Sequence, residues 1–251
     1  MLRLIILGTA NAIPDENHEN THMAIQGEER MLLIDCVSNP ILRLPQAGLE
    51  FDQLTDLILT HFHPDHVSGV PLLLMDMWLM GRRKPLNIYG LHHTLDRVEN
   101  LMGLYDWSTW PNFFPVAFHR LPSQNKTLVM ESKEFRVFAS PVRHLLPTIG
   151  LRIEFPQIGK AMAYSCDTEP CPQVIELAQD VDLLLHEATG ASTGHTSPAQ
   201  AGEVARRANA RSLLLIHYSR DQKAQDLAAQ AREKFSGEVD VARDFMRIDF
   251  A

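Results

Sequence analysis

Short runs of apolar and β-branched residues recur along the whole chain, and most of them are bounded by Gly, Pro or Asp. Such runs, about four to eight residues long with turn residues at their ends, are typical of buried strands. We therefore predict strands over Leu2–Leu7, Met31–Ile34, Leu57–Thr60, Leu86–Tyr89, Phe135–Ser140, Thr148–Phe155, Lys160–Tyr164, Val181–Leu185, Ser212–Ile216 and Val241–Ile248.

Helical patterns alternate with these strands, mainly in the second half of the chain. The predicted helices cover His66–Met80, Thr94–Tyr105, Pro170–Gln179, Ser197–Ala208 and Asp221–Lys234. Strands that follow strands, and then strands that alternate with helices, indicate an α/β protein whose sheets are sandwiched by helices. Because no low-complexity linker divides the chain, we expect a single domain.

The composition fits an ordinary globular protein. The 251 residues are 45% hydrophobic and 22% charged, which excludes a disordered, collagen-like or coiled-coil protein. The formal net charge of −8 gives no general electrostatic grip on nucleic acid. The three cysteines fit neither a disulfide framework nor a metal clip, so we expect a reducing, cytoplasmic location. The most apolar window, Val70–Met80, is far shorter than the roughly 20 residues that span a bilayer, so we predict no membrane segment.

The distribution of the histidines changes this picture. Three of the 12 histidines lie in the segment His61–His66 (HFHPDH), directly after the predicted strand Leu57–Thr60. A strand that runs into a loop places its polar residues at the end of a sheet, where a site can be open to substrate. Imidazole and carboxylate groups are good ligands for zinc. Three imidazoles crowded together without a metal would leave several polar groups unsatisfied, so the segment predicts a metal site.

The spacing within the segment allows two ions. His61 and His63, two residues apart, can point the same way from an extended chain. Asp65 and His66 follow a turn made by Pro64 and can face a second ion. Four ligands do not complete two sites, and further candidates follow other apolar runs. These candidates are His144, Asp167 and His217.

Several motifs resemble a known family. HFHPDH resembles the HxHxDH signature of the metallo-β-lactamase superfamily, and the later motifs resemble its ribonuclease Z (tRNA 3′-processing endonuclease) branch. The matching segments are Leu7–Thr9, Ile34–Cys36, Thr60–His66, Pro141–His144 with Pro147 and Gly150, Tyr164–Thr168, His186–Thr189, Gly194–Thr196 and Ile216–Ser219. HxHxDH alone indicates only the superfamily. The segment HEAT (His186–Thr189) followed by His195-Thr196 is much more specific for the ribonuclease Z branch. The resemblance implies a four-layer αββα sandwich that forms one domain over residues 1–251.

The resemblance also implies the site. One zinc would be held by His61, His63 and His144, a second by Asp65, His66 and His217, and Asp167 would bridge the two. Asp65 would also accept a proton from the attacking water. His195, oriented by Glu187, would donate a proton to the leaving oxygen.

This chemistry is physically reasonable. Two zinc ions ~3.5–4 Å apart lower the pKa of a shared water to about 7 and neutralise charge on a phosphoryl oxygen, so a metal-bound hydroxide is available. A histidine held by a carboxylate suits the role of acid. We therefore predict a hydrolase with two Zn²⁺ ions as cofactors, with Mn²⁺ or another divalent ion as alternatives.

The substrate is less constrained than the chemistry. Ribonuclease Z enzymes grip the tRNA elbow with an arm inserted before the strand that carries the bridging Asp. Residues 155–159 (FPQIG) occupy that interval here and predict a plain hairpin turn, so we expect the arm to be missing. RNA 3′ ends and a small or cyclic phosphodiester both remain candidate substrates. A sulfate ester, lactone or thioester is an alternative, and a non-catalytic metal-binding protein on the same fold is a remote one.

Three further features have no assigned role. His22, on the loop after the first strand, could approach the metals. Cys166 stands where the family usually has Gly before the bridging Asp. The aromatic stretch Tyr105–Phe118 could be a packed loop, a wall of the substrate pocket or a subunit contact. Family members are commonly dimers, so we expect a homodimer.

Overall fold

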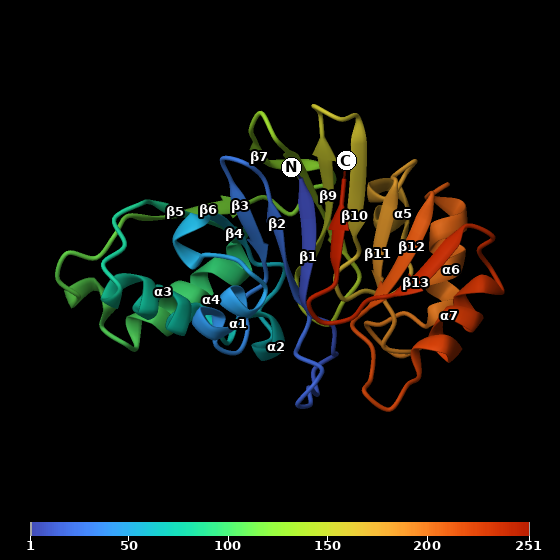
Figure 1. Ribbon diagram of the computed structural model, residues 1–251, viewed down its shortest axis with the longest axis horizontal. Coiled ribbons are helices and arrows are strands. Elements are labelled where there is room, and N and C mark those ends of the chain that lie inside the picture. The colour runs from blue at the N-terminus through green and yellow to red at the C-terminus, as the bar shows by residue number, and fades with distance from the viewer. Residues whose placement is uncertain (1, 251) are drawn as a thin grey trace.

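Two sheets packed face to face form the centre of the molecule (Figure 1). The computed structural model describes residues 2–250. Within these residues each sheet has seven strands, in the orders β14-β1-β2-β3-β4-β5-β6 and β13-β12-β11-β10-β9-β8-β7. The strands of the first sheet are β1 (Arg3–Gly8), β2 (His22–Gln26), β3 (Met31–Ile34), β4 (Leu54–Ile58), β5 (Leu86–Leu91), β6 (Val116–Leu121) and β14 (Arg247–Asp249). Those of the second sheet are β7 (Thr127–Glu131), β8 (Arg136–Val142), β9 (Thr148–Phe155), β10 (Lys160–Tyr164), β11 (Leu183–Glu187), β12 (Ser212–Ile216) and β13 (Glu238–Val241).

Helices cover the outer faces of both sheets. The helices are α1 (Pro40–Gln46), α2 (Pro64–Val67), α3 (Val70–Leu79), α4 (His92–Gly103), α5 (Pro172–Leu177), α6 (Pro198–Arg207) and α7 (Ala224–Arg232), with 3-10 turns at Phe51–Gln53 and Trp107–Thr109. In Figure 1, α1, α3 and α4 lie on the side of the first sheet, and α5 to α7 lie on the side of the second. The predicted αββα sandwich is confirmed. Among residues 2–250, every helix is too short or too polar to cross a membrane.

The alternation of side chains along the strands explains these layers. In β1, Leu4 and Ile6 point into the core between the two sheets, whereas Ile5 and Leu7 point into the core under the first helical layer. All four side chains are buried, which is why the strand is a continuous apolar run. A third core, built around Leu184 and Leu215, joins the second sheet to its helices.

Strand direction gathers the functional segments at one edge. β1 and β3 each run antiparallel to β2, and β3 runs parallel to β4, so the C-terminal ends of β1 and β4 lie at the same edge of the first sheet. In the second sheet, β8 and β10 each run antiparallel to β9, and β10, β11 and β12 are parallel neighbours. The loops that follow these strands therefore meet at one end of the sandwich.

Two predicted elements were wrong in extent. The helix expected over His66–Met80 is divided into α2 and α3, because the Gly69 N–H donates to the Cys36 carbonyl at 2.9 Å instead of to the preceding helical turn. Gly69 is also packed closely, since an added Cβ would lie 2.7 Å from the Val37 carbonyl group. The single strand expected over Val241–Ile248 is two strands in different sheets, β13 and β14. Between them Asp244 turns inward and accepts a hydrogen bond from the Thr9 hydroxyl at 2.6 Å.

The turn between β9 and β10 agrees with the expected missing arm. β9 ends at Phe155, β10 begins at Lys160, and the Ile158 N–H donates to the Phe155 carbonyl at 3.1 Å. The interval is a tight hairpin without an inserted arm.

Candidate metal centre

The four predicted ligands that follow β4 project from two different backbone conformations. The chain stays extended through His63, whose φ and ψ are −97° and 150°, and α2 then begins at Pro64. His61 and His63 therefore project from an extended segment, whereas Asp65 and His66 project from the first turn of a helix. This change of backbone conformation separates the segment into two pairs of side chains.

The first pair meets His144 from the end of β8. Nδ1 of His63 lies 3.0 Å from Nε2 of His61 and 3.3 Å from Nε2 of His144. The rings of His61 and His63 are close to perpendicular, at an interplanar angle of 79°, and the rings of His63 and His144 are at 83°. Three imidazole nitrogens thus converge on one point.

The second pair meets Asp167 and His217. One ring nitrogen or carboxylate oxygen from each of Asp65, His66, Asp167 and His217 lies within 4.8 Å of the others. Nε2 of His217 is 3.3 Å from Oδ2 of Asp167, and Nε2 of His66 is 3.5 Å from Oδ1 of Asp167. The seven side chains predicted as ligands are therefore brought together from four separate segments.

Asp167 joins the two clusters. Besides its approach to His217, its Oδ2 lies 3.9 Å from Nε2 of His144 in the first cluster. Burial alone would raise the pKa of this carboxyl, but the neighbouring His217 and His66 hold it well below its ordinary value. The carboxylate is thus ionised and faces nitrogen atoms of both clusters.

The donor set fits divalent cations. Nε2 of His66, Nε2 of His217 and Oδ1 of Asp167 are buried and have no hydrogen-bond partner among the described residues. A buried polar atom without a partner is costly, and imidazole nitrogen with carboxylate oxygen is the ligand chemistry of zinc and related ions. Cations shared by these atoms would satisfy all three.

Four of the five clustered rings are also held on the side away from the clusters, by residues to which the sequence had assigned no role. Nδ1 of His66 is 2.7 Å from Oδ2 of Asp35, and the Thr60 hydroxyl lies between Asp35 and Nδ1 of His61, at 3.1 Å from the latter. Two more rings are held in the same way. The Nδ1 acceptors are the Thr189 hydroxyl for His217, at 2.8 Å, and the Gly194 carbonyl for His144, at 2.8 Å.

These contacts set the tautomer of the rings. A nitrogen that donates to a fixed acceptor carries the proton, so the other nitrogen of the same ring is left free to bind a cation. Burial lowers the pKa of His66, but the carboxylates of Asp167 and Asp35 outweigh burial and raise the pKa well above its ordinary value. Binding of a cation at Nε2 must therefore displace a proton.

Glu187 and His195 form a pair beside the clusters. Oε1 of Glu187 is 3.0 Å from Nδ1 of His195, and the buried carboxylate also accepts from the Thr189 and Thr196 N–H groups at 2.9 and 3.0 Å. Burial lowers the pKa of His195, but the hydrogen bond and charge of Glu187 outweigh it and raise the pKa above its ordinary value. His195 is thus oriented by Glu187 and more readily protonated near neutral pH than a free histidine.

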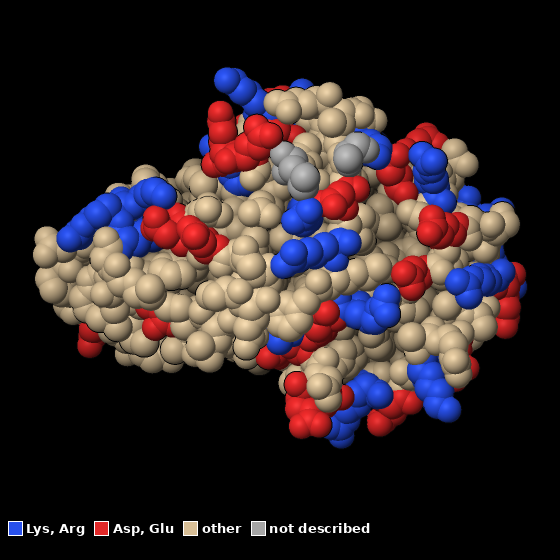
Figure 2. Space-filling view, in the orientation of Figure 1, with Lys and Arg blue, Asp and Glu red and all other residues tan. Residues whose placement is uncertain are grey.

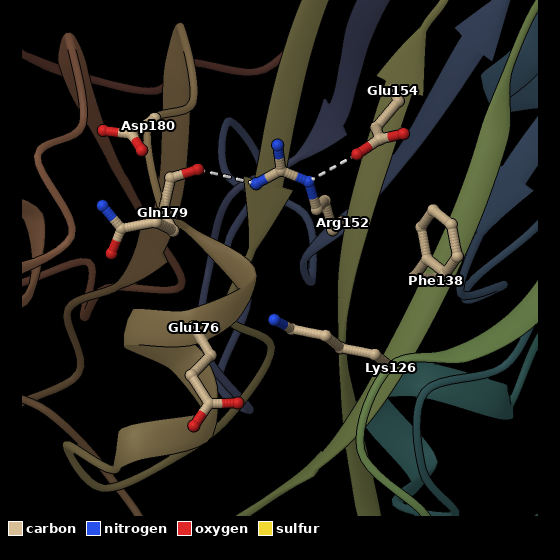
Figure 3. Close-up of a pocket in the computed structure, with 7 residues that line it drawn as sticks. All are labelled: Lys126, Phe138, Arg152, Glu154, Glu176, Gln179 and Asp180. Atoms are coloured by element: carbon tan, nitrogen blue, oxygen red, sulfur yellow. Dashed lines mark hydrogen bonds and ion pairs between the residues drawn. The ribbon is translucent and has the colours of Figure 1, made fainter.

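An open cavity of about 250 Å³ lies over the clusters. Its lining residues are Asn11, Ala12, His63, Pro64, Asp65, Asp167, Thr189, His195 and His217. A larger cavity, of about 400 Å³, lies between β8, β9 and α5 (Figure 3). Its Arg152 is already held by Glu154 and by the Gln179 carbonyl, at 2.9 and 2.8 Å, and it contains none of the predicted site residues. The smaller cavity is therefore the candidate site, because the predicted site residues line it.

His22, Cys166 and the aromatic stretch differ in how close they lie to the clusters. His22 is buried, with Nδ1 2.8 Å from the Asn20 carbonyl, and it belongs to neither cluster. Cys166 is buried with a φ of 52°, a backbone conformation that favours glycine, and its Sγ lies 3.6 Å from Nδ1 of His61. In the aromatic stretch, Trp110 stacks on Trp78 of α3 at 4.7 Å, and residues 105–118 do not line the site cavity in the described chain.

Paired sheets between helices, with histidines and carboxylates gathered at one edge, define a hydrolase of the metallo-β-lactamase fold, an enzyme class that uses divalent metals. Among solved structures, the metallo-β-lactamase fold protein YhfI from Bacillus subtilis has a TM-score of 0.84 at 22% identity, with 98% of each chain covered. The short form of human tRNase Z, ELAC1, has a TM-score of 0.81 at 25% identity, with 99% of each chain covered.

Sequence relatives lead to the same branch. A ribonuclease Z from Methanothermobacter thermautotrophicus is 28% identical over 305 aligned positions, which cover 99% of this chain and 97% of the relative. The family model described as "Anti-Pycsar protein Apyc1" matches residues 2–240, so the chain belongs to this family. The protein is a ribonuclease Z-like, metal-dependent hydrolase of ester bonds.

Proposed function

We propose that the protein is a phosphodiesterase that uses two divalent cations, with Zn²⁺ as the first choice and Mn²⁺ as the alternative. The first cation would be held by His61, His63 and His144, the second by Asp65, His66 and His217, with Asp167 in contact with both. When bound, the cations lower the pKa of a water molecule and neutralise charge on a phosphoryl oxygen. The observation that carries the proposal is the position of Asp167, within 3.9 Å of His144 in one cluster and 3.3 Å of His217 in the other.

Asp65 is the proposed base. It lines the cavity, and its Oδ2 lies 3.8 Å from Nε2 of His217. Burial raises the pKa of Asp65, but the neighbouring rings of His217 and His66 outweigh it and lower the pKa below its ordinary value. The carboxylate is therefore ionised at neutral pH and able to accept a proton from the attacking water.

His195 is the proposed acid. Its Nδ1 is engaged by Glu187, so Nε2 is the nitrogen that donates a proton to the leaving oxygen. A side-chain exposure of 19% is consistent with access from the cavity. Glu187 holds the ring in place and favours its protonated form, which a general acid requires.

A small or cyclic phosphodiester is the proposed substrate, in preference to a folded tRNA precursor. The cavity of about 250 Å³ suits a small molecule, and the tight turn at residues 155–160 offers no arm to hold a tRNA. On the face shown in Figure 2, Lys and Arg residues are interspersed with Asp and Glu instead of forming one basic surface. Phosphate contacts by Lys and Arg dominate affinity for nucleic acid, and this face lacks a continuous basic surface that would hold a tRNA.

A substrate panel tests the proposal. Purified protein loaded with Zn²⁺ or Mn²⁺ is assayed on bis(p-nitrophenyl) phosphate, a cyclic nucleotide, p-nitrophenyl sulfate, a lactone and a tRNA precursor. We expect cleavage of the two small phosphodiesters and little or no cleavage of the other three. Faster cleavage of the sulfate or lactone would show another ester hydrolase, and faster cleavage of the tRNA precursor would show that the missing arm does not restrict the substrate.

We also propose that the protein is a homodimer. Near the C-terminal ends of α3 and α4, Leu79, Met80 and Leu104 are 64%, 59% and 81% exposed. Covering such apolar side chains is favourable. Light scattering after gel filtration is expected to give twice the mass of one chain, and the mass of a single chain would contradict the dimer.

A further inference from the structure

The loop between β1 and β2 forms one wall of the site cavity. Asn11 and Ala12, at the start of this loop, line the cavity together with Asp65 and His195. The base of the loop is closed by hydrogen bonds from the Ala10 N–H to the Glu19 carbonyl at 2.7 Å and from the Thr21 N–H to the Ala10 carbonyl at 3.0 Å. Asn11 is thus held next to a fixed backbone ladder, although the tip of the loop is exposed.

All but one of the polar groups of Asn11 have a partner. Its N–H donates to the Tyr218 carbonyl at 3.1 Å, and its own carbonyl accepts from Nδ2 of Asn20 at 2.6 Å. Its side-chain oxygen accepts from the Ile13 N–H at 3.1 Å. Because a backbone N–H can only donate, the side-chain atom that faces Ile13 must be the oxygen. The remaining group, the NH₂ of the amide, has no partner among residues 2–250.

The position of this NH₂ group points to a role with substrate. Tyr218, which anchors Asn11, directly follows His217 of the second cluster, so Asn11 stands beside that cluster. The Thr189 hydroxyl, which also lines the cavity, is already committed, since it donates to the His217 carbonyl at 2.8 Å. Asn11 therefore supplies a free, neutral and firmly positioned N–H donor in the wall of the cavity.

We infer that Asn11 is a substrate-binding residue whose Nδ2 donates a hydrogen bond to a non-bridging phosphoryl oxygen. This inference rests on the proposed phosphodiesterase function. Charge on such an oxygen grows as the attacking water adds to phosphorus. A donor that is already in place stabilises this charge without reorganisation, and loss of one such donor costs about 10²–10³ in turnover.

Two matched variants test the inference. Asn11→Asp keeps an oxygen to accept from Ile13 but replaces the NH₂ group with a negatively charged oxygen. Asn17→Asp makes the same change of charge in the same loop, at a residue that does not line the site cavity. The readouts are kcat and KM for bis(p-nitrophenyl) phosphate, the inhibition constant of inorganic phosphate, metal content and the midpoint of thermal unfolding.

We expect N11D to lower kcat/KM by about 10²–10³ and to weaken inhibition by phosphate, with metal content and unfolding midpoint at wild-type values. N17D is expected to stay within about twofold of wild type. Wild-type kcat/KM in N11D would overturn the inference, and so would a fall in activity that only tracks a loss of metal. Lack of activity in wild type and N17D would instead overturn the proposed function itself.

A second substitution of Asn11 covers the case in which N11D does not fold. Asn11→Ala removes the NH₂ group without adding a charge, and it also frees the Ile13 N–H. We expect at least a tenfold loss of kcat/KM and weaker inhibition by phosphate. Values for both that equal those of wild type would contradict a contact between Asn11 and the phosphoryl group.

Discussion

Oδ2 of Asp35 lies 2.7 Å from Nδ1 of His66, and both side chains are buried. The other oxygen of Asp35 accepts from the Thr60 N–H at 2.8 Å, and the Thr60 hydroxyl contacts His61. One carboxylate therefore orients a ring in each cluster, directly for His66 and through a hydroxyl for His61. Asp35 does not line the site cavity, so its effect must pass through the two rings.

Asp35→Asn is accordingly expected to weaken metal binding. An amide keeps one acceptor oxygen but loses the charge that holds the proton on Nδ1 of His66, and loss of such a contact typically lowers metal affinity by about 10–100-fold. Zn²⁺ titration against a competing chelator measures the affinity of both sites. Asp221→Asn, at an exposed aspartate, is the control and should bind as wild type. Equal affinities for D35N and wild type would show that Asp35 does not orient the rings.

His195→Ala separates the proposed acid from the proposed ligands. Because His195 is assigned to proton transfer, its loss should slow turnover of bis(p-nitrophenyl) phosphate by about 10²–10⁴ and leave metal content unchanged. His92→Ala, at an exposed histidine of α4, is the matched control. Loss of metal in H195A would identify His195 as a ligand instead of an acid.

Gly194 allows close contact between its loop and His144. Its φ is +83°, and an added Cβ would lie 2.9 Å from Nδ1 of His144, the nitrogen that its own carbonyl holds. Gly194→Ala should therefore displace His144 and lower metal content and activity together. Gly159→Ala is a close control, because Gly159 also has a positive φ, of +63°, but an added Cβ would meet nothing within 4 Å. Equal metal content in the two variants would refute the steric argument.

The buried His186 should make stability depend on pH. Burial lowers the pKa of His186 to about 4. Between pH 6.5 and 4 the unfolded chain then binds more protons at this position than the folded chain does, so the free energy of unfolding falls as the pH falls.

His186→Asn removes this titration while keeping a side-chain donor for the Glu187 carbonyl. Urea unfolding at pH 7 and pH 5 measures the effect. We expect the loss of stability between these two pH values to be smaller in H186N than in wild type by roughly 2 kcal/mol. The same loss in both proteins would mean that His186 is not buried in its neutral form.

The pattern of the sequence indicated sheets sandwiched by helices and candidate ligands at strand ends, for a physical reason. The ends of strands such as β4 and β12 are marked by the change from apolar to polar residues, and the edge of a sheet brings such ends together. The role of Asp35 could not be predicted, because its contact with His66 spans 31 positions and depends on how β3 and β4 pair. The division of Val241–Ile248 was missed because Asp244 is held by tertiary contacts that leave no local pattern.

The most direct test of the account is anomalous X-ray diffraction, at the zinc absorption edge, from crystals of protein purified with Zn²⁺. We predict two anomalous peaks per chain. One should lie among His61, His63 and His144 and the other among Asp65, His66 and His217, with Asp167 in contact with both. A single peak, or peaks outside these side chains, would contradict the two-cation centre on which the proposed chemistry depends.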